Sequence, residues 1–144
     1  MELASGVAAF EAKEFARAMQ LLRPLAEQGD PRAQYRVAVM AQVGLGVGKN
    51  CASAVRWMRA AAEQGYALAQ HGLGFMYFQG ECTKVDPAEA ARWFRLAADQ
   101  GLAGSQSTLA MMYEKGVGVE RDAAAAAKWH ALAEKDSGAP PANS

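Results

Sequence analysis

Residues 67–101 read ALAQHGLGFMYFQGECTKVDPAEAARWFRLAADQG, and this stretch decides the fold. Its first part predicts a helix from about Ala67 to Phe78. Gly80 is expected to end that helix, because glycine tolerates the left-handed backbone of a C-cap. Asp86 is expected to cap a second helix, with a proline at the first helical position, where a missing N–H costs nothing. The second helix is expected to end at Gly101. The stretch therefore predicts two helices joined by a short loop.

The same pattern recurs along the chain with a period of 36 residues. The three tryptophans of the chain, Trp57, Trp93 and Trp129, have this spacing, and equal spacing of a rare residue indicates a repeat. Shifting the sequence by 36 residues aligns further identities without a gap: Gln34, Gln70 and Gln106; Met40, Met76 and Met112; Gly44, Gly80 and Gly116; Ala61, Ala97 and Ala133. Asn50 and Asp122 correspond to the capping Asp86. The repeats are predicted to span 30–65, 66–101 and 102–137, after a leading helix pair over 1–29.

These repeats predict an all-α fold. Alanine-rich helices let their axes approach closely, and stacked helix pairs form an α-solenoid. We therefore expect a right-handed α/α superhelix of antiparallel helix pairs with 36-residue repeats, in a single repeat domain over residues 1–137. Residues 138–144 are short, polar and contain two prolines, so we expect a disordered tail there.

Charge and hydropathy exclude several classes of protein. Fifteen basic residues balance fifteen acidic residues, whereas a nucleic-acid binder needs a net positive surface. No run approaches the roughly 20 apolar residues that span a bilayer, so no membrane span is expected. The first residues have neither the basic opening nor the apolar core of a signal peptide. The sequence as written predicts a cytoplasmic protein; a periplasmic or secreted protein is the alternative if a signal peptide was removed.

The sequence gives no indication of an enzyme. Its two histidines, His71 and His130, lie at different places in the repeat and have no paired cysteine or carboxylate at ligand spacing. A Cys–His nucleophile would also lack a third group to orient it. We therefore expect no catalytic residue, no metal and no cofactor.

The repeat pattern Ala-Gln-x-x-Leu-Gly-x-x-Tyr-x-x-Gly, then a loop and Asp, then Ala-x-x-Trp-x-x-x-Ala-Ala-x-x-Gly, resembles the Sel-one-like repeat (SLR). This family, here of bacterial type, is related to the tetratricopeptide repeat. The middle copy carries the resemblance with Ala69-Gln70, Leu73-Gly74, Tyr77, Gly80, Asp86, Ala90, Trp93, Ala97-Ala98 and Gly101. The first copy departs from the pattern, with Ala41 in place of Tyr77 and Tyr113, and Val37-Ala38 in place of Leu-Gly. These departures bear on local packing, not on the fold.

The resemblance implies an adaptor that holds protein partners together. We therefore expect a protein or peptide partner. In related solenoids the first helix of each repeat lines the concave surface. In the middle copy, one stripe of the first helix is expected to face the core: Ala69, Leu73, Met76 and Tyr77. A second apolar stripe lies roughly 150° away. This second stripe and its counterparts give the predicted partner-binding residues: Arg32, Tyr35, Val39, Val43, Leu68, His71, Phe75, Phe78, Met111 and Glu114.

Two other uses of the surface are left open. The run Ala123–Ala127 with Trp129 could form an apolar terminal face for a homodimer, because solenoid ends need protection. The chain is thus expected to be a monomer or a weak homodimer. Arginines four residues before an acid are expected to form helix-surface ion pairs with it, namely Arg23 with Glu27, Arg59 with Glu63 and Arg95 with Asp99. A convex basic strip that also includes Arg56, Arg92 and Lys128 is an alternative contact site.

Overall fold

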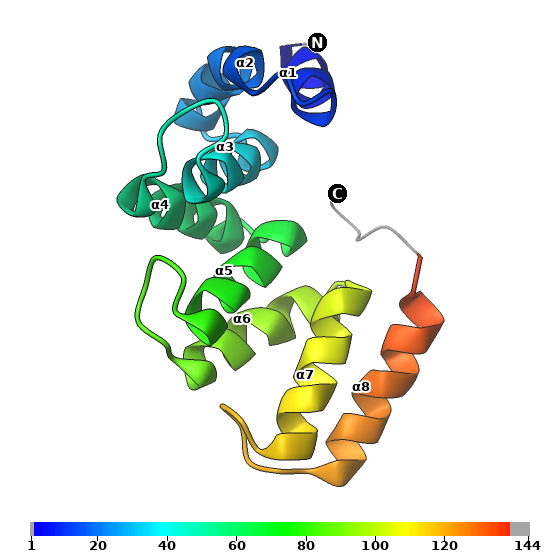
Figure 1. The fold of residues 1–144 in the computed structure, drawn as a ribbon. Helices are drawn as coiled ribbons and strands as arrows, with labels where there is room; N and C mark the ends of the chain where they lie inside the picture. Colours follow the sequence, from blue (N-terminus) through cyan, green and yellow to red (C-terminus); the bar gives the residue numbers. More distant parts are fainter. Residues whose placement is uncertain (1, 139–144) are drawn as a thin grey trace. The chain divides into compact units, whose positions relative to one another are not determined.

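A computed structural model describes residues 2–138 of the chain, and every regular element among them is a helix (Figure 1). The helices are α1 (Glu2–Glu11), α2 (Phe15–Glu27), α3 (Pro31–Val43), α4 (Cys51–Glu63), α5 (Ala67–Gln79), α6 (Pro87–Asp99), α7 (Ala103–Lys115) and α8 (Ala123–Asp136). The described chain falls into two compact units, one ending at Gln64 and one beginning at Gly65. Unit 1 contains α1 to α4, and unit 2 contains α5 to α8.

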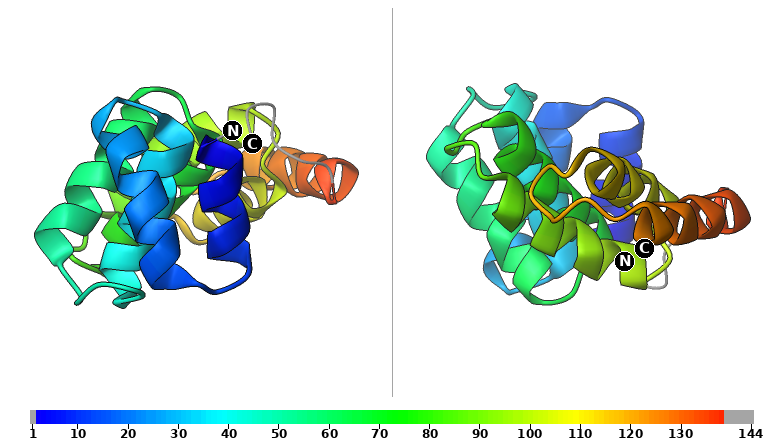
Figure 2. Two further views of the ribbon diagram at one scale, coloured as in Figure 1. Left: turned by 90° about the horizontal axis from the view of Figure 1, so that it is seen from above. Right: turned by 90° about the horizontal axis from the view of Figure 1, so that it is seen from below.

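Within each unit, helices that follow one another in sequence pack side by side. In unit 1, α1 pairs with α2 and α3 with α4, and α2 also packs against α3. In unit 2, α5 pairs with α6 and α7 with α8, and α6 packs against α7. Figures 1 and 2 show these antiparallel pairs joined by short connections. The predicted all-helical fold of helix pairs is confirmed.

The ends of the helices fall where the repeat pattern predicted them. Helices α3, α5 and α7 are each 13 residues long. Each is followed by a left-handed glycine C-cap, and the φ angles of Gly44, Gly80 and Gly116 are 87°, 73° and 67°. The side chains of Asn50 and Asp86 cap the second helices, each accepting a hydrogen bond from the backbone N–H three residues ahead. Asp122 does the same at α8.

Each unit has its own core. In unit 1, Leu22 and Met40 are fully buried among small alanines such as Ala18 and Ala33. In unit 2 the largest fully buried side chain is Phe94, which packs with Leu109, Met112 and Trp129. The predicted core stripe of α5 is confirmed for Ala69, Leu73 and Met76, which are inaccessible to solvent, whereas Tyr77 is half-buried against the core cluster.

In the repeats over 30–65 and 66–101, a glutamine just after the second helix donates hydrogen bonds to a buried glutamine of the first helix and to backbone. The Nε2 atom of Gln64 donates to the backbone oxygen of Gly29 at 3.0 Å and to Oε1 of Gln34 at 2.8 Å. Gln100 repeats this arrangement in unit 2, with bonds of 2.8 Å and 3.0 Å to Gly65 and Gln70. Glutamine recurs in every repeat at the place of Gln34, whose Nε2 atom donates to the backbone oxygen of Ala26 at 3.1 Å, as that of Gln106 does to Ala98 at 3.1 Å; these bonds satisfy polar backbone of the preceding helix.

The prediction of a single repeat domain over residues 1–137 stays a prediction. The part of the predicted disordered tail that covers residues 139–144 lies outside the described residues.

Candidate functional site

In unit 1, the predicted binding residues lie along one face of α3. We call Arg32, Tyr35, Val39 and Val43 the α3 stripe; their spacings of three, four and four residues keep them on one side of the helix. Arg32 is exposed and pairs with the capping Asp30 at 3.2 Å. Tyr35 and Val39 are half-buried. Val43 is 60% exposed, which is unusual for a large apolar side chain. The α3 stripe is therefore an apolar surface with a charged end.

In unit 2, the predicted residues of α5 gather over the buried ring of Phe94. We call Leu68, His71, Phe75 and Phe78 the α5 stripe, and all its members are half-buried. The ring centroid of Phe75 lies 5.0 Å from that of Phe94, and the centroid of Phe78 lies 6.4 Å from it, both edge to face. Edge-to-face ring pairs stabilise the core by more than the burial of their apolar area alone. The α5 stripe therefore has an inner edge in the core and an outer edge at the surface.

His71 is held in place from two sides. Its Nδ1 atom and the Oγ atom of the buried Ser105 are 2.6 Å apart, at hydrogen-bond distance. Its ring meets Phe75 edge to face at 4.8 Å. Burial lowers the pKa of His71 below its usual value, because an apolar environment disfavours the charged imidazolium. A neutral imidazole is thus part of the α5 stripe.

The predicted residues of α7 have different surroundings. Met111 is half-buried and packs against the core cluster around Phe94. Glu114 is exposed, and its Oε1 atom lies 2.6 Å from Nε2 of His130 on α8. The sequence pattern indicates no carboxylate partner for this histidine. The partner is 16 residues away, and only the antiparallel packing of α7 on α8 brings it near.

The basic residues next to the tryptophans follow the repeat. Arg56 and Arg92 each lie over the indole ring of the tryptophan that follows them, at 4.6 Å from its centroid. Lys128 lies 5.6 Å from the ring of Trp129. Cation–π contacts of this kind give these charges, on α4, α6 and α8, a structural role.

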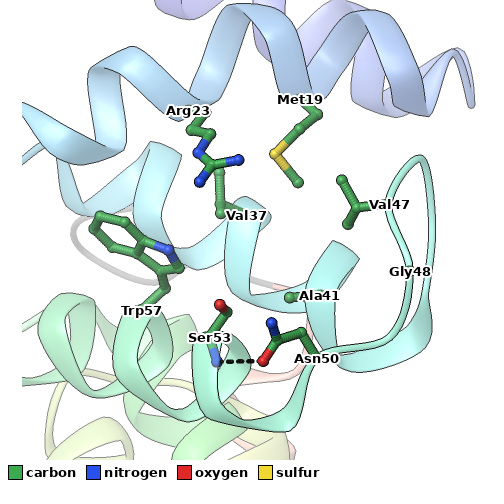
Figure 3. Close-up of a pocket in the computed structure, with 9 residues that line it drawn as sticks. All are labelled: Met19, Arg23, Val37, Ala41, Val47, Gly48, Asn50, Ser53 and Trp57. Carbon is green, nitrogen blue, oxygen red and sulfur yellow. Dashed lines mark hydrogen bonds between the residues drawn. The ribbon is translucent and has the colours of Figure 1, made fainter.

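Not all of the ion pairs predicted between an arginine and an acid four residues later are present. Arg95 pairs with Asp99 at 3.3 Å, as predicted. Arg23 forms no ion pair with Glu27 or with any other residue that the structure describes, so that prediction is wrong. The reason lies in its direction, because the guanidinium of Arg23 turns toward a cavity instead of along the helix (Figure 3).

The predicted apolar terminal face needs a correction. Trp129 is only 5% exposed, because it packs into the core of unit 2 with Phe94 and Leu109. The exposed side of α8 therefore offers alanines, charged residues and His130 but no tryptophan, which removes the main apolar contribution to the predicted homodimer face.

Unit 1 also has a cavity that the sequence pattern did not predict. It has a volume of about 140 Å³ and lies between α2, α3 and α4. None of the predicted binding residues lines it. The substitution of Ala41 for the tyrosine of the other repeats could have indicated it, because a smaller side chain at a packed position leaves space.

Among the described residues, no three His, Cys, Asp or Glu side chains come together as a group able to hold a metal ion. No described helix has the length and apolar character needed to cross a membrane.

Comparison with known proteins gives a consistent assignment. A family model described as "Sel1 repeat" matches residues 12–30, 31–66, 67–102 and 103–136. No curated protein matches the chain. Among solved structures, a Sel1 repeat protein from Oxalobacter formigenes is similar, with 32% sequence identity over 94% of this chain and a TM-score of 0.90.

A second similar structure is c5321, described as a protective antigen present in uropathogenic Escherichia coli strains displaying an SLR fold. It is 38% identical over 94% of this chain, with a TM-score of 0.88. The chain spans 56% of the Oxalobacter protein and 30% of the Escherichia coli protein.

Proposed function

Because this chain belongs to the Sel1 repeat family, whose members are generally scaffolds for protein interactions, we propose that it binds a peptide or protein segment. The first helices of its repeats carry the contact residues. In unit 1 these are the α3 stripe, and in unit 2 the α5 stripe with Met111 and Glu114 of α7.

One observation carries this proposal. Val43 is 60% exposed at the end of α3, in line with the half-buried Tyr35 and Val39. The fold gives no reason for an apolar side chain there, since the same place in the other repeats holds Gln79 and Lys115. Exposed apolar positions that continue an apolar stripe are typical of interaction surfaces.

The α5 stripe supports the same proposal. Phe78 is half-buried and lies at the edge of the aromatic cluster around Phe94. Its counterparts in the other repeats are Gln42 and Glu114, so the fold does not need a ring at this place. Aromatic side chains with one packed edge and one open edge lose little conformational entropy on binding, and they are enriched among the residues that dominate binding energy.

The test is selection of a displayed peptide library on the whole chain, followed by affinity measurement on variants. Val43→Ser has a matched control in Val85→Ser, because Val85 is 61% exposed but lies in the loop after α5, outside both stripes. Tyr35→Ala and Phe78→Ala complete the set. We expect loss of affinity for the three stripe variants and none for Val85→Ser. Peptides that bind all four variants as well as the unmodified chain would place the contact surface elsewhere and overturn the proposal.

A further inference from the structure

The cavity of unit 1 lies where the first repeat has an alanine in place of an aromatic residue. Ala41 lines the cavity, and the same position holds Tyr77 and Tyr113 in the other repeats. Both tyrosines pack against the core cluster of unit 2. At the next position along this side of α3, Val37 stands where the other repeats have leucine. The first repeat therefore lacks the volume of a phenol ring at a place where the chain elsewhere supplies one.

The tryptophan beside the cavity is also less buried than its counterparts in the other repeats. Trp57 is half-buried, whereas its counterparts Trp93 and Trp129 are only 4% and 5% exposed. Figure 3 shows the indole of Trp57 at one side of the cavity, below the guanidinium of Arg23. Apolar cavities of about 150 Å³ hold a benzene ring. The cavity in unit 1, at about 140 Å³, thus has room for one aromatic ring.

The cavity also lacks a carboxylate that the second repeat has. In unit 2, Glu89 accepts a hydrogen bond from Nε1 of Trp93 at 3.1 Å and pairs with Arg92 at 2.8 Å. Ser53 holds the place of Glu89 in the first repeat. Nε1 of Trp57 accordingly donates no hydrogen bond to any residue that the structure describes.

The polar groups around the cavity are suited to an anion. Arg23 has no ion pair within the described chain, although its counterpart Arg95 pairs with Asp99. Asn50 uses Oδ1 to cap α4, which leaves its amide N–H groups for another acceptor. No acidic residue lines the cavity. A guanidinium, an indole N–H and an amide around one space favour a carboxylate, because hydrogen bonds to ionised acceptors are the stronger ones.

We propose that this cavity is a second binding site, for a peptide segment in which an aromatic residue lies beside a carboxylate. The ring fills the space left by Ala41, and the carboxylate accepts hydrogen bonds from Trp57 and Arg23. The ligand thereby supplies the two groups that Tyr77 and Glu89 supply in the second repeat. The site is independent of the α3 and α5 stripes, because none of their residues lines it.

The experiment uses the whole chain and follows the indole N–H resonances of its three tryptophans by NMR. The probes are N-acetyl-tyrosine, which has a ring and a carboxylate, and N-acetyl-tyrosinamide, which has only the ring. A third probe, N-acetyl-Glu-Tyr-amide, has the carboxylate on a neighbouring side chain. We expect the Trp57 resonance to shift with saturation, and the tyrosinamide to bind roughly tenfold more weakly than the better of the two acids.

Two variants restore what the second repeat has. Ala41→Tyr fills the cavity and Ser53→Glu supplies the carboxylate, and each should abolish the probe-induced shift of Trp57. Since tyrosine and glutamate are native to the second repeat, both variants are expected to fold, which their melting curves check. Arg23→Gln should remove the preference for acids, while Arg17→Gln on the exposed side of α2 should leave binding unchanged.

Equal binding of acid and amide, or an unaltered Trp57 shift in Ala41→Tyr, would overturn the proposal. Library peptides that bind Val43→Ser, Tyr35→Ala and Phe78→Ala as well as the unmodified chain would overturn the proposed function alone, since none of these three residues lines the cavity.

Discussion

The ring of Phe94 lies directly against the backbone of Gly74, so that a Cβ added to the glycine would be 2.8 Å from Cε1 of the ring. Both residues are fully buried in unit 2. The same pair of positions holds Ala38 with Met58 in unit 1, and both of these are buried too. Helix α5 thus has the smaller residue, Gly74, where the partner is a rigid ring. Helix α3 has the larger residue, Ala38, where the partner is a flexible thioether.

This relationship predicts opposite effects of one substitution in two backgrounds. Gly74→Ala should gain up to about 1 kcal/mol of helix propensity, but the clash with Phe94 should cost about 1–3 kcal/mol. In the Phe94→Met background, which reproduces the pair of unit 1, the clash is relieved and the same change should stabilise. Urea denaturation of the four chains of this cycle measures the coupling. Equal effects of Gly74→Ala in both backgrounds would contradict the close packing.

Gln106 supports a second prediction, because its buried Oε1 atom has no hydrogen-bond partner among residues 2–138. Its Nε2 atom donates to Ala98 O at 3.1 Å and to Oδ2 of Asp136 at 2.9 Å. In the first repeat, the counterpart of Asp136 is Gln64, whose amide donates to Oε1 of Gln34. An aspartate cannot donate such a bond.

We therefore expect Asp136→Gln to raise the free energy of unfolding by about 1 kcal/mol, since an unmet buried acceptor costs about 1–3 kcal/mol. Thermal melting at neutral pH measures the change. Asp136→Ala is the control, because it removes an acceptor without adding a donor and should destabilise. A glutamine variant no more stable than the alanine variant would show that Oε1 of Gln106 is satisfied in some other way.

Much of this fold could be predicted because the features that specify it are local and repeated. Gly80 and Asp86 specify helix ends through their own backbone and side chain, so the sequence pattern locates them. The candidate site was harder to predict. The contact between Glu114 and His130 depends on how α7 and α8 pack, which no local pattern encodes. The departure at Ala41 was visible in the sequence, but a cavity depends on whether neighbouring side chains relax into the space.

A third prediction concerns the loop after α7. Gly118 has a φ of 73°, and a Cβ there would lie 2.2 Å from the backbone oxygen of Pro87. Gly29 has a φ of 99° but no atom within 4 Å of such a Cβ. Both glycine-to-alanine changes cost roughly 1–2 kcal/mol for the left-handed backbone. Gly118→Ala should cost a further 1–3 kcal/mol or so for the clash. Chemical denaturation compares the two, and equal losses would exclude a tight contact between Gly118 and Pro87.

The last prediction follows from the lowered pKa of His71, which burial causes. The groups around its ring are Ser105, Phe75, Phe94 and Gly104, none of which titrates near neutral pH. In the unfolded chain the histidine takes up a proton as the pH falls through about 6.5, whereas in the folded chain it does so only at lower pH. The unfolded state then binds more protons, so the stability must fall as the pH decreases below about 6.5.

At pH 5.5 this loss is at most about 1.4 kcal/mol relative to pH 7.5, because one proton and one pH unit are involved. His71→Gln also removes the contacts of the imidazole ring, which changes the free energy of unfolding at every pH. The readout is therefore the difference in the free energy of unfolding between the two pH values. That difference should be smaller in His71→Gln than in the unmodified chain. His130→Gln, on the exposed side of α8, serves as the control for removing a histidine as such. An unchanged pH dependence in His71→Gln would mean that the imidazole becomes charged as readily in the folded protein as in the unfolded chain.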